Sequence, residues 1–411
     1  MSGCGCDGHD LLPVDQVIEH LLSRAPAPPK IELVPLAAAL GRVLAQEVLA
    51  PSDVPAWDNS AMDGYALRAA DLPLEGGYLP LAGRIAAGDS GQTRLLAGHA
   101  VRIFTGAPLP PGADSVVAQE DCRAEGNGVW LPAVKAGTHV RQQGEELRRG
   151  ALLLSAGQRL RPQEIGLLAS IGLAQVSVYR RLRVGLLSSG DELREPGQTL
   201  EAGQIYNANR FSLGAVLRSL GMEVHDYEVM ADDLSASRDA LSLAASEWDM
   251  LLTSGGVSVG EEDHLKQAIR ELGQLHLWRL AIQPGKPLAF GEVGGKPWLG
   301  LPGNPAAALI TALIVARPFL LRAQGRSVVM PQPLQLSAGF SWLTPRPRRQ
   351  YLRARLVADG TGQLSVQLHP QQGSAMLSSA CWSDGLAVIE IGQTLQAGEA
   401  VSYLSFAELL L

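Results

Sequence analysis

Residues 248–272, WDMLLTSGGVSVGEEDHLKQAIREL, limit the possible folds more than any other segment, because an apolar run is followed there by a glycine-rich turn and a helical pattern. Residues 248–253 have the length and apolarity of a buried strand. Four apolar residues then recur at the spacing of one helix face: Leu265, Ala268, Ile269 and Leu272. The glycines of the turn allow positive φ and a close approach of backbone to ligand. The stretch predicts a strand, a tight loop and a helix whose start can bind an anion such as phosphate.

Three acidic residues in the same turn conflict with a bare phosphate: Glu261, Glu262 and Asp263. A hard cation such as Mg²⁺ that bridges carboxylates and phosphate would remove the conflict. The alternative is that these acids only cap the helix and interact with its dipole.

The surrounding segment, residues 183–321, alternates strand and helix patterns, as in a mostly parallel sheet with both faces covered. Since parallel strands point the same way, the residues that follow them collect at one edge, where open α/β sheets bind ligands. Glu192, Asp232 and Asp263 each follow a strand in this segment. Three separate strand ends with a carboxylate favour a metal or ligand site over capping.

Further polar residues are candidate contacts, each with a simpler alternative. Lys286 lies between two prolines, and Pro302, Gly303, Asn304 and Pro305 form a turn that feeds a helix; the alternatives are a solvated lysine and a plain helix start. Asp63 and Thr105 lie in proline- and glycine-rich loops, where both also suit turn closure. Five arginines lie in or next to one predicted strand: Arg346, Arg348, Arg349, Arg353 and Arg355. Their guanidinium groups could bind phosphate, or they could form a solvated face of the strand.

Composition limits the function classes. Of the 411 residues, 46% are hydrophobic and 18% charged, and the net charge of −7 gives no basic field for nucleic acid or an anionic membrane. No apolar run reaches about 18 residues, and the N-terminus lacks the basic region followed by an apolar one that marks a signal peptide, so we expect a cytoplasmic protein. The four cysteines do not suggest a disulfide framework. Cys4, Cys6 and His9 offer soft ligands but lack a second pair, so a disordered leader is expected at 1–10.

The order of patterns predicts a multidomain α/β plus β protein. A discontinuous helical N-terminal domain is expected at 11–50 and 147–180, including a helix in LAAALGRVLAQEV, with a second helical pattern at 161–171. It is interrupted by a β-domain at 51–146 and followed by a mostly parallel α/β sheet domain at 181–328. A C-terminal β-barrel is expected at 329–411.

The chain has no P-loop, no dinucleotide fingerprint after the first strand of the sheet domain, and no G-x-S-x-G or HExxH motif. Six other motifs occur: NSAMDGYA at 59–66, FTGAPLPPGAD at 104–114, SSGDEL at 188–193, SGGVSVGEEDH at 254–264, PGKP at 284–287 and LPGNP at 301–305. In this order they resemble the MoeA and gephyrin E-domain family, the molybdopterin molybdenumtransferases.

The resemblance implies an enzyme that binds adenylylated molybdopterin and molybdate and, with Mg²⁺, inserts molybdenum and releases AMP. By motif position it implies that Asp63, Glu192, Asp232 and Asp263 are catalytic, the last three being metal candidates. It implies substrate contacts at Thr105, Lys286, Arg349 and Ser374. The glycine-rich turn and the PGNP turn add five candidate substrate contacts from their own chemistry: Gly255, Gly256, Ser258, Pro302 and Asn304. The resemblance also implies a homodimer whose clefts join two subunits, with an upstream molybdopterin adenylyltransferase and downstream molybdoenzyme maturation proteins as partners.

Two positions depart from the family pattern. The usual GED reads Gly144, Glu145, Glu146, and the first lysine of KPGKP is replaced by Gln283, which removes a positive charge unless Arg279 compensates. A non-catalytic molybdopterin-binding scaffold is therefore an alternative reading, and a molybdopterin adenylyltransferase is a third.

Overall fold

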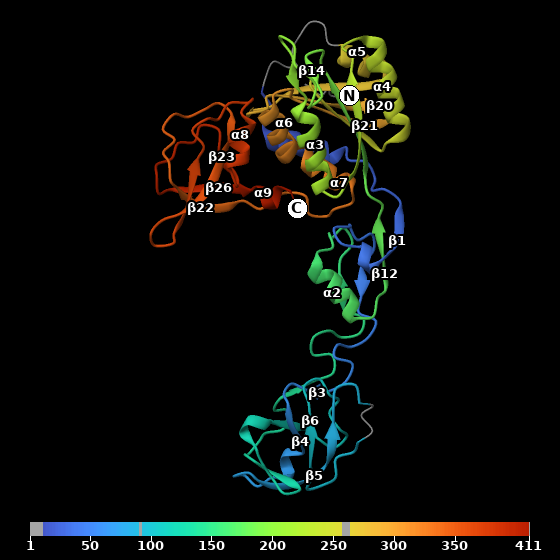
Figure 1. Cartoon of the computed structure of the whole chain (residues 1–411), viewed down its shortest axis with the longest axis vertical. Coiled ribbons are helices and arrows are strands. Elements are labelled where there is room, and N and C mark those ends of the chain that lie inside the picture. The colour runs from blue at the N-terminus through green and yellow to red at the C-terminus, as the bar shows by residue number, and fades with distance from the viewer. Residues whose placement is uncertain (1–10, 90–92, 257–263, 411) are drawn as a thin grey trace.

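The fold is described from a computed structural model that covers residues 11–89, 93–256 and 264–410. The molecule is long: an α/β domain and a barrel lie side by side at one end, a small elongated domain follows, and a β-domain forms the far end (Figure 1). The multidomain α/β plus β architecture predicted from the sequence is confirmed.

A six-stranded mixed sheet forms the centre of the α/β domain. In spatial order its strands are β16 (Glu223–Met230), β13 (Arg183–Ser189), β17 (Met250–Ser254), β21 (Lys296–Leu301), β20 (Pro287–Val293) and β18 (Gly273–Arg279). The first four are parallel, and β20 and β18 are antiparallel to their neighbours. Every residue of β17 is buried, as its unbroken apolar sequence predicts. The carboxyl ends of four strands therefore meet at one edge.

Helices cover both faces of this sheet because adjacent residues of each strand point to opposite sides. Leu186 packs with α3 (Ala208–Ser219), whereas Leu187 packs with α4 (Leu234–Glu247) and α5 (His264–Leu272). In α5 the predicted apolar face is present, since Leu265, Ala268 and Ile269 are buried.

One 19-residue helix, Pro305–Ala323, is long and apolar enough to cross a membrane, but 89% of its apolar window is buried inside the protein. It consists of α6 (Pro305–Thr311), the π-helical segment η4 (Ala312–Ala316) and α7 (Arg317–Ala323). Its Phe319 and Leu320 belong to the main core, so it is the central core helix of the domain.

Helix α1 (Val14–Ser23) packs against α7 and buries Val17, Ile18 and Leu21 in the same core. It therefore belongs to the α/β domain and not to the elongated domain to which the sequence pattern assigned it. An amphipathic pattern shows that a helix buries one face but not which domain receives it.

The elongated domain is built from segments before and after the β-domain. Strand β1 (Ile31–Pro35) pairs with β12 (Gln175–Tyr179), and β2 (Val48–Leu49) pairs with β11 (Leu152–Leu154). The predicted helix at 161–171 is present as α2 (Pro162–Ser170). The helix expected in LAAALGRVLAQEV is wrong: only η1 (Leu36–Ala38) is helical, and the following residues form turns and isolated bridges. Gly41, at φ +74°, interrupts that helical pattern.

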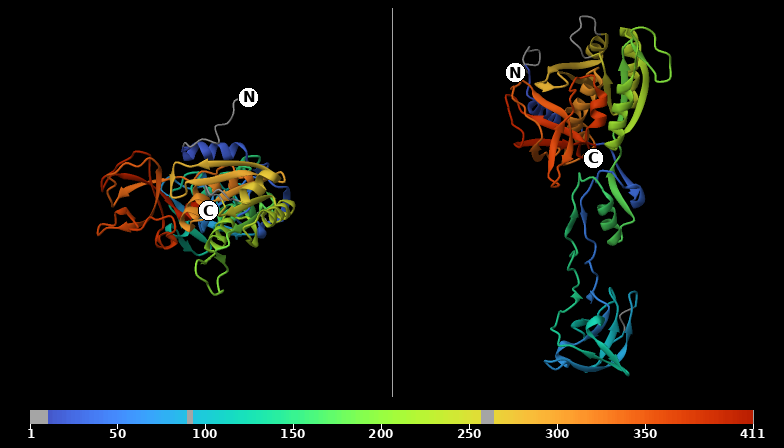
Figure 2. Two further views of the ribbon diagram at one scale, coloured as in Figure 1. Left: turned by 90° about the horizontal axis from the view of Figure 1, so that it is seen from above. Right: turned by 60° about the vertical axis from the view of Figure 1, so that its left-hand side comes forward.

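Two extended segments lead side by side from this domain to the β-domain (Figure 2), joined by the hydrogen bond from Ala50 N to Ala151 O at 2.9 Å. The β-domain has a six-stranded sheet and a small two-stranded one. In order the first has β7 (Ser115–Ala118), β4 (Gly64–Leu67), β6 (Ala100–Ile103), β5 (Gly77–Ile85), β9 (Gly128–Leu131) and β8 (Arg123–Glu125). The second pairs β3 (Asn59–Ser60) with β10 (Val140–Arg141), and η2 (Ala69–Asp71) and η3 (Gln119–Asp121) are short helical turns.

The C-terminal barrel is a ring of five strands: β23 (Arg349–Ala358), β24 (Leu364–Leu368), β22 (Leu334–Ala338), β26 (Ala400–Ser405) and β25 (Gly385–Ile389). Pairing of β25 with β23 closes it. The short strand β19 (Ile282–Gln283) comes from the α/β domain and pairs with β23, so the two domains share backbone hydrogen bonds. Two helices, α8 (Leu377–Trp382) and α9 (Phe406–Leu409), complete the domain.

Candidate functional site

A cleft of about 1060 Å³ opens between the carboxyl ends of the parallel strands and a loop of the barrel. Its lining contains residues that follow each of β13, β16, β17 and β21, the PGKP turn before β20, and residues 372–375 of the barrel loop. Eight predicted site residues line it: Glu192, Asp232, Gly255, Gly256, Lys286, Pro302, Asn304 and Ser374. Two others, Ser258 and Asp263, lie outside the described residues.

Glu192 and Asp232 bring carboxylates to this cleft from the ends of β13 and β16. Both side chains are exposed to it. The loops that carry them are tied together, because the backbone N–H of Asp232 donates to Asp191 Oδ1 at 3.2 Å. Gly190 lies directly against the glutamate: a Cβ added there would be 2.6 Å from Glu192 Oε2. Glycine at position 190 therefore leaves room for the carboxylate of Glu192.

Gly255 and Gly256 begin the glycine-rich turn, with φ of +89° and +63°. A Cβ on Gly255 would be 2.9 Å from the carbonyl oxygen of Ser189, and one on Gly256 would be 2.6 Å from Leu265 Cδ2. Both positions thus need glycine for their conformation and for the space around them. The turn places its backbone in the lining of the cleft.

Asn209 connects three parts of the site, although no motif in the sequence marks it as a site residue. Its amide Nδ2 donates to Ser254 Oγ and to the carbonyl oxygen of Gly303, both at 2.7 Å. The side chain is buried, so these bonds fix the start of α3 against the end of β17 and the PGNP turn. The only sequence signal was a polar residue in the first turn of an expected helix, which most often indicates capping.

The PGKP turn is fixed by close packing. A Cβ on Gly285 would be 2.2 Å from Thr311 Oγ1, so the turn lies directly on helix α6. The carbonyl oxygen of Lys286 accepts from the N–H of Leu280 at 2.7 Å, and the side chain of Lys286 is exposed in the cleft. Gln283 also lines the cleft, whereas Arg279 does not appear among the described lining residues. The replacement of the first lysine of the KPGKP pattern by Gln283 therefore removes a positive charge from the lining of the cleft.

The arginine that supports the barrel loop is Arg353, one of the five arginines expected to form a phosphate fork or a solvated face. Its side chain is fully buried, and it donates to Gly373 O at 2.9 Å and to Ser379 Oγ at 3.0 Å. Burial lowers the pKa of Arg353 to about 10. The same loop binds helix α6 through the hydrogen bond from Ala307 N to Ser374 O at 3.0 Å. The loop is thus held from both domains.

Arg349 does not reach the cleft, contrary to its predicted role as an anion contact. Its guanidinium binds both oxygens of Asp15 at 2.8 Å and Glu390 Oε2 at 2.7 Å. The neighbouring Arg348 lines the cleft instead. Neighbouring residues in an extended segment point to opposite sides. Arg348 therefore lines the cleft, whereas Arg349, one position later, forms a structural ion pair.

Asp63 and Thr105 lie together in the β-domain, far from the cleft within one chain (Figure 1). The backbone N–H and the hydroxyl of Thr105 both donate to Asp63 Oδ1 at 2.8 Å. These bonds, the backbone bond first, lower the pKa of Asp63 below its usual value. Beside them, the guanidinium carbons of Arg84 and Arg102 lie 4.6 and 4.7 Å from the Phe104 ring centroid. The pair therefore forms a partly exposed carboxylate whose ionised form is stabilised by Thr105 and, to a smaller extent, by the positive charge of Arg102.

Among the residues that the structure describes, no group of three or more His, Cys, Asp or Glu side chains could hold a metal by itself. Cys122 and Cys381, the two cysteines in the described part of the chain, are free thiols. The leader residues Cys4, Cys6 and His9 lie outside the described part. Glu146 lies at the junction of the elongated domain and the β-domain, where its N–H donates to Val54 O at 3.0 Å.

Models of known families match nearly the whole chain. Residues 12–172 match the MoeA N-terminal region (domain I and II), residues 185–322 a probable molybdopterin binding domain, and residues 335–406 the MoeA C-terminal region (domain IV).

Individual relatives match over the full length. The molybdopterin molybdenumtransferase of Haemophilus influenzae is 37% identical over 404 residues, 97% of this chain and 100% of that protein. That of Nostoc sp. is 39% identical over 94% of this chain and 92% of its own length. Among solved structures, a molybdopterin biosynthesis MoeA protein from Pyrococcus horikoshii superimposes with a TM-score of 0.77 at 32% identity, covering 97% of this chain and 99% of that one.

Proposed function

The chain belongs to the MoeA family of molybdopterin molybdenumtransferases, and we propose that it takes molybdopterin in adenylylated form and releases AMP as it inserts molybdenum from molybdate. Insertion of molybdenum into molybdopterin, a step of molybdenum cofactor biosynthesis, is the function of the family. One observation supports the finer proposal: carboxylates, a lysine and a glycine turn converge at the carboxyl ends of four parallel strands. A phosphorylated ligand with a divalent cation matches these groups.

Glu192 and Asp232 fit Mg²⁺ because both offer hard oxygen donors in one cleft. Mg²⁺ is commonly bound by one or two carboxylates together with substrate phosphates, so two carboxylates are sufficient. Asp263 is a further candidate from its sequence position. When bound, the ion would neutralise charge on the phosphate oxygens.

The other residues of the cleft bind and orient the substrate in this proposal. Lys286 attracts the phosphate, and the backbone of Gly255 and Gly256 approaches it closely because neither residue carries a Cβ. Asn304 and Ser374 provide further polar contacts from the two sides of the cleft. Since Asn209 and Arg353 tie these loops to buried positions, the donors are arranged before substrate binds.

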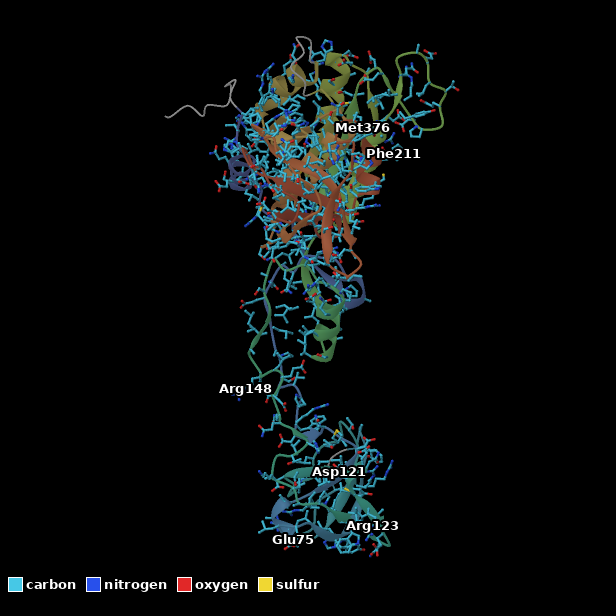
Figure 3. All side chains as sticks on the ribbon, turned by 90° about the vertical axis from the view of Figure 1, so that its left-hand side faces the viewer. Glu75, Asp121, Arg123, Arg148, Phe211 and Met376 are labelled. Carbon is cyan, nitrogen blue, oxygen red and sulfur yellow. The ribbon has the colours of Figure 1, made fainter. Side chains whose placement is uncertain are left out.

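We further propose a homodimer in which Asp63 and Thr105 of one subunit complete the cleft of the other. Within one chain the β-domain lies at the opposite end of the molecule from the cleft (Figure 3, where Glu75, Asp121 and Arg123 mark the β-domain). The elongated domain exposes large apolar side chains suited to an interface: Ile31 at 53%, Leu33 at 61%, Leu49 at 50% and Leu152 at 56%.

The test of the chemistry is AMP release from adenylylated molybdopterin with Mg²⁺ and molybdate. We expect Glu192→Gln and Asp232→Asn to lower the rate by about 100-fold or more. Asp233→Asn is the matched control, because Asp233 lies next to Asp232 but only caps α4, accepting from Ala236 N at 2.9 Å. Unchanged release in the first two variants would remove these residues from the mechanism. ATP consumption would favour the adenylyltransferase, and binding without turnover would favour the scaffold.

Subunit complementation tests the shared cleft. Asp63→Asn and Glu192→Gln proteins should each be inactive, but a re-equilibrated mixture should recover about one quarter of wild-type activity. Half of the dimers are then mixed, and each mixed dimer has one intact cleft. If both residues acted within one chain, the mixture would stay inactive.

The proposal also includes a cytoplasmic location, an upstream molybdopterin adenylyltransferase that supplies the substrate, and downstream molybdoenzyme maturation proteins.

A further inference from the structure

Tyr206 is the one aromatic side chain among the described residues that line the cleft. It lies on the short strand β15 (Ile205–Tyr206), which pairs in parallel with β14 (Leu193–Arg194). The residue is 44% exposed, so much of its ring surface is not covered by the protein. The rest of the lining is mainly polar groups, glycines, prolines and small aliphatic side chains.

The position of Tyr206 is fixed on several sides. Its hydroxyl donates to the carbonyl oxygen of Gln198 at 2.8 Å, which restricts rotation of the side chain. On one side of it, the N–H of Ile205 donates to Glu192 O at 2.8 Å. On the other, the N–H of Asn207 donates to Arg194 O at 2.9 Å, and the side chain of Asn207 caps α3. An exposed ring held in this way loses little conformational entropy when a ligand covers it.

The backbone bond from Ile205 to Glu192 also places the ring beside the segment that carries a proposed phosphate and metal contact. The substrate of the proposed function has a phosphoanhydride of two phosphates, with a pterin toward one end and adenine toward the other. Glu192 and Tyr206 line the same cleft, so a ring of a ligand whose phosphate lies near Glu192 is within reach of Tyr206.

We propose that Tyr206 stacks against a flat heteroaromatic ring of the substrate and thereby sets the affinity of the cleft for it. Stacking suits the two rings alike, because each presents a π-face of similar size. This inference rests on the proposed function, since it takes the adenylylated pterin as the ligand.

The test measures dissociation constants of the purified full-length protein for two probes, AMP and molybdopterin without adenylate, by calorimetry with Mg²⁺ present. Tyr206→Leu should weaken binding of at least one probe by about tenfold. Tyr206→Phe keeps the ring and should stay within about threefold of wild type. Phe211→Leu is the matched control: Phe211 is 52% exposed on α3 but does not line the cleft, and it should bind both probes as wild type does.

The outcome also assigns the ring. Loss of AMP binding alone identifies adenine, and loss of molybdopterin binding alone identifies pterin; each supports the proposal. Wild-type affinity of Tyr206→Leu for both probes would overturn it, and so would an equal loss in Tyr206→Phe. Failure of the proposed function would be seen differently: the wild-type enzyme itself would release no AMP in the AMP assay. In that assay Tyr206→Leu should raise KM and leave kcat nearly unchanged.

Discussion

Arg349 and Asp15 are 334 positions apart in sequence and form a bidentate ion pair, with both N–O distances at 2.8 Å. The pair joins barrel strand β23 to helix α1 of the α/β domain. The Arg349 guanidinium lowers the pKa of Asp15 below its usual value. Arg349 therefore has a structural role in holding the two domains that enclose the cleft.

Replacement of Arg349 by methionine should lower the free energy of unfolding by about 1 kcal/mol, since the pair is partly exposed. The dissociation constant for AMP should stay near that of the wild type. Arg348→Met is the matched variant, for which we expect the opposite pattern because Arg348 lines the cleft. Because the folded-state pKa of Asp15 is depressed, the stabilisation is present above the unfolded value of 3.8 and disappears as the pH falls below it. Denaturant titrations at pH 7 and pH 3 should show this difference.

Gly190→Ala should reduce AMP release strongly, by about tenfold or more, because the new Cβ would meet the Glu192 carboxylate and displace it. Gly197→Ala separates this effect from backbone strain. Gly197 also has positive φ, +97°, but has no heavy atom within 4 Å of an added Cβ. Both variants should lose some thermal stability, and only Gly190→Ala should lose activity. Equal activity of the two would show that the space beside Glu192 does not matter.

Thr105→Val should raise the pKa of Asp63 toward 3.8, because the hydroxyl is one of the two donors that stabilise the ionised form. Carboxyl ¹³C shifts followed between pH 2 and pH 6 would measure the change. Thr361→Val is a control with the same local geometry, since the N–H and hydroxyl of Thr361 donate to Asp359 Oδ1 at 2.8 and 2.6 Å. We expect both threonine variants to shift their partner aspartates and only Thr105→Val to slow AMP release. Slowing by both would indicate a general effect on folding.

Gln283→Lys should tighten AMP binding by several-fold at low salt, because it returns a positive charge to the lining of the cleft. The gain should fall as the salt concentration rises, since the cleft is open to solvent. Gln372→Lys, also in the lining but on the barrel side, tests whether position or charge alone matters. At an ionic strength of about 20 mM the screening length is about 20 Å, so a charge added within the cleft still acts on a bound anion. If neither substitution changes the dissociation constant for AMP in about 20 mM salt, binding of the anion does not depend on charge at these two positions.

The local elements and their chemistry follow from the order of the residues alone. The apolar run before the glycine turn has the length of a buried strand, and it forms β17; the i, i+3, i+4 spacing after it gives the buried face of α5. Parallel strands then place Glu192 and Asp232 at one edge, because residues after such strands share that edge whatever the loops do. The motifs likewise identified the family, since six short segments in one order are specific even where each alone is weak.

Which side chains of a cluster face the cleft and which support it depends on how the folded elements pack together. Arg348, Arg349 and Arg353 look alike in sequence, yet one lines the cleft, one pairs with Asp15 and one is buried under the loop of Ser374. The packing of α1 on the sheet domain and the bonds of Asn209 depend in the same way on contacts between distant segments. Periodicity and propensity are set within a few residues, whereas the partner of a polar side chain is chosen by how whole elements dock.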